Sequence, residues 1–157
     1  MKKLEVSFNS PQCGWMSIGF DDGANEFHTT TAHTPHSHAL SEILKGLKSL
    51  LETENAKDEF VIAWSRNPEA FDLRFKRDAD KIAFRVIEYP TGNRLMSESK
   101  IVFSHEGAVK DLCSSFYQTF EQLYRDRETD EFEFNWRQPF PFEEYAQFKS
   151  KLEEMRI

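Results

Sequence analysis

This sequence contains few cysteines, no long apolar run and no leader-like start. Cys13 and Cys113 are its only cysteines, and no Asn-x-Ser/Thr sequon occurs. Two lone thiols far apart in sequence indicate a reducing compartment rather than a disulfide framework. No stretch approaches the roughly 20 apolar residues that span a bilayer, and residues 1–5 reach an acid without the apolar region of a signal peptide. We therefore expect a cytoplasmic protein with no membrane partner.

Positive charge is also scarce. The chain has 20 lysines and arginines against 27 aspartates and glutamates, which gives a net charge of −7. The phosphates of nucleic acids and anionic lipids require a basic surface, so this balance disfavours both as partners. An acidic surface favours attraction to a basic protein instead. We expect a basic protein partner and no nucleic acid.

Phenylalanine is the residue that the sequence has in excess, with 15 Phe against 4 Tyr and 3 Trp. Phe has no polar group to satisfy, so this composition indicates a filled hydrophobic interior rather than a disordered chain. A length of 157 residues fits one domain, and no linker or internal repeat divides it. We expect a single domain over residues 1–157.

The first third of the chain predicts three short strands and a helix. Leu4, Val6 and Phe8 alternate with polar residues, which is the period of a half-buried strand. Residues 15–20 and 26–31 predict two more strands, joined by a turn rich in Asp, Gly and Asn. Ser37 is suited to cap a helix, and leucines at helical spacing predict that helix over 38–53.

The remainder predicts four strands and two helices. Alternating apolar residues mark strands over 60–64, 71–76 and 82–86, and a shorter strand over 101–103. Apolar stripes predict one helix over about 106–127 and another that starts near Pro139, because Pro suits a first helical turn. The order βββα-ββββ-αα favours an α+β fold, with a mostly antiparallel sheet of six or seven strands and three helices packed on one face.

Three familiar motifs fail on inspection. Gly14 and Gly19 have the spacing of a phosphate loop, but the required Lys is absent and Asp21 follows. His105-Glu106 begins like a zinc-protease helix, but Val109 stands where the second His is needed, so a helix-start position explains the pair better. The acid pairs Asp21/Asp22 and Asp78/Asp80 fall in expected turns and Glu143/Glu144 in the first turn of a helix, so each has a structural explanation. These observations favour a non-enzymatic protein.

Histidines form the one unusual concentration, since four of the five lie between residues 28 and 38. His36 and His38 fall on one side of an extended chain and His33 could complete a third corner, which is the hypothesis of a zinc site. Two observations oppose it. No cysteine lies nearby, and the run ends at a helix start, where the helix dipole disfavours a cation.

Two further groups are candidate interaction residues. Arg74, Lys76 and Arg85 are expected on the outward face of a hairpin, where they could hold an acidic group or pair with neighbours such as Asp72. Trp136 opens a segment dense in aromatics and Pro. That segment is either a docking surface or a plug that fastens the last helix, and we favour the plug.

Several features of this layout occur together in a group of small bacterial proteins. They are Gly14-Trp15 in an early hairpin, the leucine-rich helix, Phe71-x-Leu73-Arg74-Phe75-x-Arg77-Asp78-x-Asp80, and Trp136-x-x-Pro139-Phe140-Pro141. In these features the chain resembles uncharacterised bacterial α+β proteins and immunity proteins that neutralise secreted toxins. The resemblance implies a binding role and carries over no functional residue.

The sequence therefore predicts a protein-binding domain, of which an immunity-type inhibitor of a basic toxin is one form. One alternative is a metal-binding protein or metal-dependent enzyme that uses His33, His36 and His38. Another is a homo-oligomer whose exposed aromatic side chains bury one another.

Overall fold

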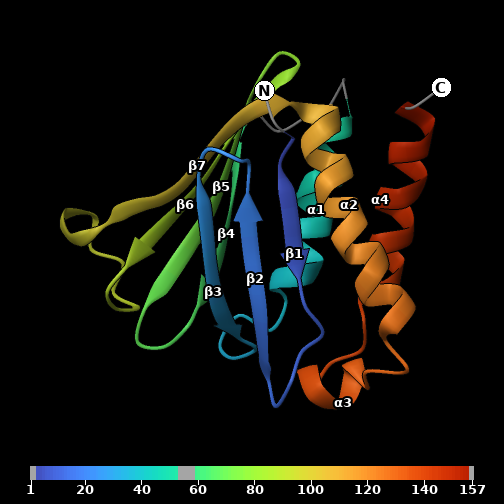
Figure 1. The fold of residues 1–157 in the computed structure, drawn as a ribbon, viewed down its shortest axis with the longest axis horizontal. Coiled ribbons are helices and arrows are strands. Elements are labelled where there is room, and N and C mark those ends of the chain that lie inside the picture. Colours follow the sequence, from blue (N-terminus) through green and yellow to red (C-terminus); the bar gives the residue numbers. More distant parts are fainter. Residues whose placement is uncertain (1–2, 53–58, 156–157) are drawn as a thin grey trace.

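The chain folds into two antiparallel sheets and a set of helices that lies to one side of them (Figure 1). This computed structural model describes residues 3–52 and 59–155. The first sheet holds β1 (Glu5–Phe8), β2 (Trp15–Asp21) and β3 (Glu26–Ala32), in that order. Its β2–β3 turn forms because the carboxylates of Asp21 and Asp22 accept backbone N–H bonds within the turn.

The second sheet contains four strands in sequence order, β4 (Glu59–Ser65), β5 (Ala70–Asp78), β6 (Lys81–Tyr89) and β7 (Lys100–Ala108). Each strand pairs with the next in antiparallel register, and a bulge interrupts the β6–β7 ladder after Val86. The loop between β6 and β7 carries a short 3-10 turn, η1 (Met96–Glu98).

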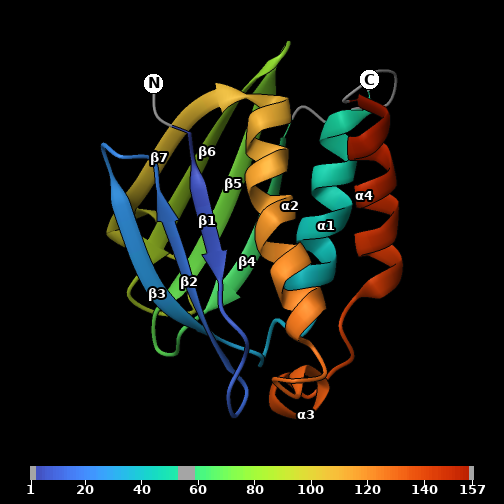
Figure 2. The ribbon, with the colours of Figure 1, turned by 45° about the vertical axis from the view of Figure 1, so that its right-hand side comes forward.

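Four α-helices complete the fold. They are α1 (Ala39–Leu51), α2 (Val109–Asp126), α3 (Phe132–Trp136) and α4 (Phe142–Met155). Figure 2 shows α1, α2 and α4 side by side on one flank of the sheets, with α3 below them. Helix α2 packs against β1, and α4 packs against α1. Within the described residues, no helix is long and apolar enough to cross a membrane.

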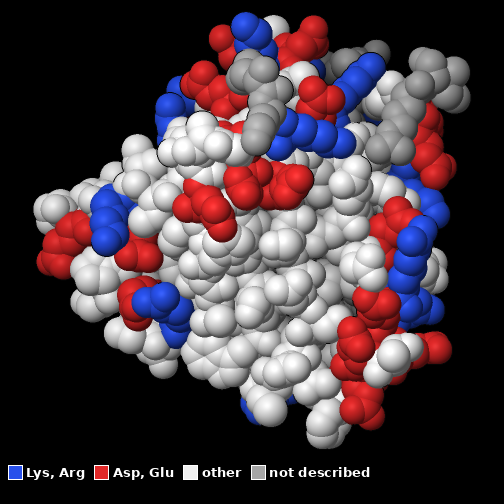
Figure 3. Space-filling view, in the orientation of Figure 1, with Lys and Arg blue, Asp and Glu red and all other residues white. Residues whose placement is uncertain are grey.

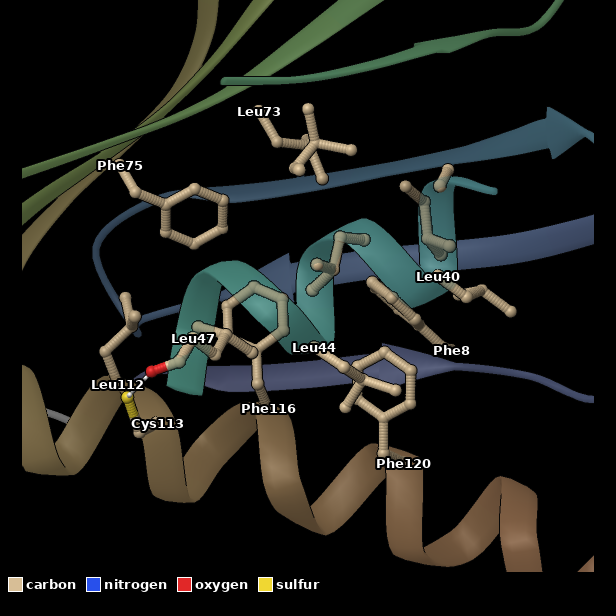
Figure 4. Close-up of a cluster of buried hydrophobic side chains, with 14 of the residues drawn as sticks. Phe8, Leu40, Leu44, Leu47, Leu73, Phe75, Leu112, Cys113, Phe116 and Phe120 are labelled. Carbon is tan, nitrogen blue, oxygen red and sulfur yellow. Dashed lines mark hydrogen bonds between the residues drawn. The ribbon is translucent and has the colours of Figure 1, made fainter. Parts of the chain in front are cut away.

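Aromatic side chains fill the space between the two sheets and the helices. The Phe20 ring of β2 lies 5.0 Å from the Phe84 ring of β6, so the two sheets face one another across the core. The Phe8 ring of β1 lies 6.0 Å from the Phe116 ring and 5.7 Å from the Phe120 ring, both on α2. Figure 4 shows these rings meeting the leucines of α1. Mixed edge-on and tilted ring pairs of this kind stabilise a core beyond their buried area.

The expected α+β class, antiparallel pairing and seven strands are confirmed, whereas the expected single sheet and three helices are wrong. The strands divide into two sheets because α1 separates β3 from β4 along the chain. Strand β3 contacts β4 and β7, but among the described strands it pairs with β2. Helix α3 is the additional helix. It has only five residues, too few for an apolar period to reveal it.

Two expected helix starts are also corrected. The N-cap of α1 is His38 rather than Ser37, and it makes no side-chain capping bond. Strand β7 continues through Ala108, so α2 begins at Val109 and His105 lies on a strand rather than at a helix start. Strand pairing with β6 holds this segment extended.

Candidate interaction surface

The three histidines predicted to bind zinc do not form a ligand group. Within the described ranges, no cluster of three His, Cys, Asp or Glu side chains is placed to hold a metal ion. The His33 ring packs edge-on against Trp136 with centroids 5.4 Å apart, and its Nε2 is buried without a hydrogen-bond partner. Burial, with Arg137 and His38 nearby, lowers the pKa of His33. Zinc binding stays a prediction that a titration can test.

The predicted basic residues lie on the outward face of the second sheet, where Arg74 and Arg85 are register partners. Arg74 is partly buried beside Asp72, with Nη2 3.7 Å from its Oδ2. The Arg94 Nε also donates to the Asp72 carboxylate, at 3.1 Å, and the Tyr89 hydroxyl donates to it at 2.9 Å. Arg74 is therefore part of an internal polar cluster, as expected from pairing with its neighbour.

Trp136 does not lie on the surface, although it was a candidate interaction residue. Its side chain is buried, and its ring lies 6.3 Å from that of Trp64 and against His33. The burial of Trp136 fits the plug interpretation for this residue, whereas Phe142 at the other end of the same segment is exposed. Trp136 fastens α3 and the start of α4 to the body of the protein.

A pocket opens between the end of α2, α3 and the start of α4. It has a volume of about 450 Å³. We call it the aromatic pocket because four of its eight lining residues carry rings. Its lining residues are Tyr124, Arg127, Glu128, Phe132, Glu133, Pro139, Phe140 and Phe142.

The rings of the aromatic pocket form a continuous set. The Tyr124 ring lies 5.6 Å from Phe140 and 5.5 Å from Phe142, and Phe132 lies 5.5 Å from Phe140. Phe142, which lines the pocket, is 53% exposed, and Phe134, which lies on α3 outside the pocket lining, is 78% exposed. Large apolar side chains this exposed, grouped beside a pocket, mark an interaction site more often than scattered ones do.

Two glutamates, Glu128 and Glu133, line the aromatic pocket, and they belong to an acid-rich stretch of the chain. Residues 126–133, the acidic segment, hold five acids and one base. Figure 3 shows acidic side chains gathered at the lower right, where Figure 1 places the end of α2 and α3. The carboxylates of Glu128 and Glu133 form no ion pair within the described part of the chain. The one base, Arg127, lies over the Tyr124 ring, 3.8 Å from its centroid.

Helix α3 is held firmly enough to present Phe134. It begins after Glu131 and ends before Arg137, and both of these residues have positive φ. Asn135 fixes it on two sides. Its side-chain amide donates to the carbonyl of Glu131, and its backbone carbonyl accepts a 2.6 Å bond from the N–H of Gly14. The β1–β2 turn and α3 are therefore joined directly.

The sequence predicts only part of this surface. It offers the segment that begins at Trp136 as a docking surface or a plug and favours the plug, and it places Phe142 on the apolar stripe of the last helix. It gives the acidic segment no role beyond connecting two helices. The signal present in the sequence was the closeness of Phe134 and Phe142 to a run of acids. A segment that only had to be solvated would not need large apolar side chains among its acids.

A second pair missed from sequence is His105 and Asp22, which are 83 residues apart. The His105 Nδ1 lies 3.0 Å from the Asp22 Oδ2, and both side chains are nearly buried. Burial raises the pKa of Asp22, but hydrogen bonds from His105 and from the N–H groups of Asn25 and Ala24 outweigh this and hold the pKa below its usual value.

Comparison with known proteins gives no relative: no family model, no curated protein and no solved structure matches this chain.

Proposed function

We propose that this chain is a protein-binding domain that holds a basic partner protein against the aromatic pocket. The observation that carries the proposal is the exposure of Phe142 in a pocket whose carboxylates, Glu128 and Glu133, have no ion-pair partner in the described residues. Phe134 is exposed on α3, the helix that supplies Phe132 and Glu133 to the pocket. An apolar centre with an acidic rim has the anatomy of an interface that selects a basic surface.

The energetics of this surface fit such a role. Fully burying a Phe side chain stabilises a complex by about 1.5–3 kcal/mol, so two exposed rings could act as the anchors of an interface. The surrounding carboxylates would accelerate encounter with a basic protein, and salt would screen that effect. The stability of the fold gives no reason for these rings and carboxylates to lie on the surface, which leaves them available for binding.

An immunity-type inhibitor is the form of this function that the resemblance implies. A basic toxin would then be the partner, and the chain would block its surface by occupying it. In that case the purified chain abolishes the activity of the partner at equimolar concentration. A partner without toxic activity would leave the binding role in place and remove the immunity role.

Affinity capture from the native host tests the proposal. We expect wild-type protein to retain a basic protein that the Phe134→Ala/Phe142→Ala double variant does not retain. Ile101→Ala is the matched control, because Ile101 is a 60% exposed apolar residue on β7, remote from the pocket. Recovery of the same proteins by the double variant and by wild type would contradict the proposal.

A further inference from the structure

We infer that the aromatic pocket receives the guanidinium group of an arginine from the partner, which takes the place of Arg127 on the Tyr124 ring. This inference rests on the proposed function and specifies the chemistry of its anchor. The pocket combines ring surfaces with carboxylates, and both attract cations.

The guanidinium of Arg127 already occupies part of the pocket. The Arg127 Cζ lies 3.8 Å from the centroid of the Tyr124 ring, well within the range of a cation–π contact. The ring face therefore accepts a planar cation in the geometry that an incoming arginine would need. Arg127 shows what this pocket selects.

Arg127 is weakly held in this position. Its guanidinium forms no ion pair with a carboxylate in the described part of the chain, although acids precede and follow it. Besides the ring, its Nη1 donates a 2.5 Å bond to the carbonyl of Tyr124. A cation held by one ring and one carbonyl can be displaced by another that also meets a carboxylate.

The carboxylates of the pocket offer an incoming arginine a second contact. Glu128 and Glu133 both line the pocket, and neither is in an ion pair in the described ranges. A planar guanidinium can stack on a ring and donate sideways to a carboxylate at the same time. A lysine ammonium cannot do both equally well. The pocket is therefore expected to prefer arginine over lysine.

A set of labelled peptides provides the direct test, with affinity measured by fluorescence anisotropy at low salt. The probes are a short peptide with two arginines, the same peptide with lysines, and the same peptide with citrullines, which keep the shape and lose the charge. We expect the arginine peptide to bind at least tenfold more tightly than the citrulline peptide, and more tightly than the lysine peptide. Equal binding of the three, or no binding of any, would overturn the inference.

Variants locate the binding. Glu133→Gln and Phe142→Ala should each lower the affinity for the arginine peptide about fivefold. Glu153→Gln, which removes an exposed acid far along α4, should change that affinity less than twofold. Thermal unfolding of each variant checks that the fold is retained. Equal losses in Glu133→Gln and Glu153→Gln would show that general charge, and not the pocket, binds the peptide.

Removing the resident cation gives the sharpest comparison. Arg127→Ala should tighten arginine-peptide binding at least threefold, because the competitor is gone. Arg125→Ala removes the same charge two residues away, from a side chain that is 68% exposed and paired with Glu121, and should have a smaller effect. Equal effects would overturn the displacement. The peptide experiments test the arginine site alone. A partner can still be captured through Phe134 and Phe142 if no arginine preference is found.

Discussion

The His105 imidazole of β7 donates from Nδ1 to the Asp22 carboxylate of the β2–β3 turn, across a distance of 3.0 Å. This bond joins the far end of the first sheet to the edge strand of the second. The side chains are only 10% and 12% exposed, so losing either partner would leave a nearly buried polar group unsatisfied.

Asp22→Asn and His105→Gln are each expected to lower the free energy of unfolding by about 1–3 kcal/mol, the cost of a buried polar group without its partner. Urea denaturation measures the change. His28→Gln is the control, because the His28–Glu26 pair is exposed on β3, and it should cost less than about 0.5 kcal/mol. A cost for the control as large as that of the buried pair would contradict the assigned role.

His33 makes stability depend on pH. Its pKa is lowered by burial and by Arg137 and His38, so the unfolded chain binds the proton more readily than the folded one. The contribution of neutral His33 to the free energy of unfolding is therefore fully present above the usual His pKa of about 6.5. It is lost as the pH falls through the lowered pKa of the folded protein. We expect wild-type protein to lose stability from pH 7.5 to pH 5 in urea denaturation, and His33→Gln to lose less. Identical profiles would contradict this account.

The polar cluster on the second sheet depends on Asp72, which receives bonds from Tyr89 and Arg94. Asp72→Ala should destabilise the protein by about 3 kcal/mol, because it leaves partly buried Arg94 without its carboxylate. Tyr89→Phe removes one neutral donor and should cost about 1 kcal/mol. Chemical denaturation of both variants provides the comparison, and a Tyr89→Phe cost equal to that of Asp72→Ala would be inconsistent with a charge-centred cluster.

Gly46, inside α1, lies against the Phe60 ring, and a Cβ at this position would collide with that ring. Phe60 cannot move freely, because it stacks on Phe75 with centroids 4.4 Å apart. Gly46→Ala should therefore destabilise by about 1–3 kcal/mol, although alanine in a helix interior normally stabilises by roughly 1 kcal/mol. In a Phe60→Ala background the same change should become stabilising. A stabilised single variant would show that no collision occurs.

The sequence predicted the fold class and the strand runs because apolar alternation is strong at sites such as Phe71 to Phe75 and Ile82 to Val86. It could not predict the division into two sheets, because a contact between distant segments, such as that of the Phe20 ring with the Phe84 ring, leaves no local pattern in the sequence. It favoured a plug for the segment from Trp136 to Phe142, in which Trp136 is buried and Phe142 is exposed. It treated both cysteines alike, whereas Cys113 is buried and Cys13 is exposed.

The candidate surface was less predictable. Whether Phe142 faces the core or the solvent depends on where α3 turns the chain, and α3 follows from two residues with positive φ, Glu131 and Arg137. Neither is a glycine or asparagine, so turn chemistry gave no warning. The position of the Arg127 guanidinium over the Tyr124 ring likewise depends on how α2 ends rather than on a sequence motif.

The binding role is tested most directly by calorimetry of the captured basic protein with wild type and with the Phe134→Ala/Phe142→Ala variant. Burial of two rings predicts an affinity at least tenfold lower for the variant, where tenfold corresponds to about 1.4 kcal/mol. It also predicts an unchanged affinity for Ile101→Ala. Equal affinity of the double variant and the wild type would show that the partner binds elsewhere and that the exposed aromatic surface is not the interface.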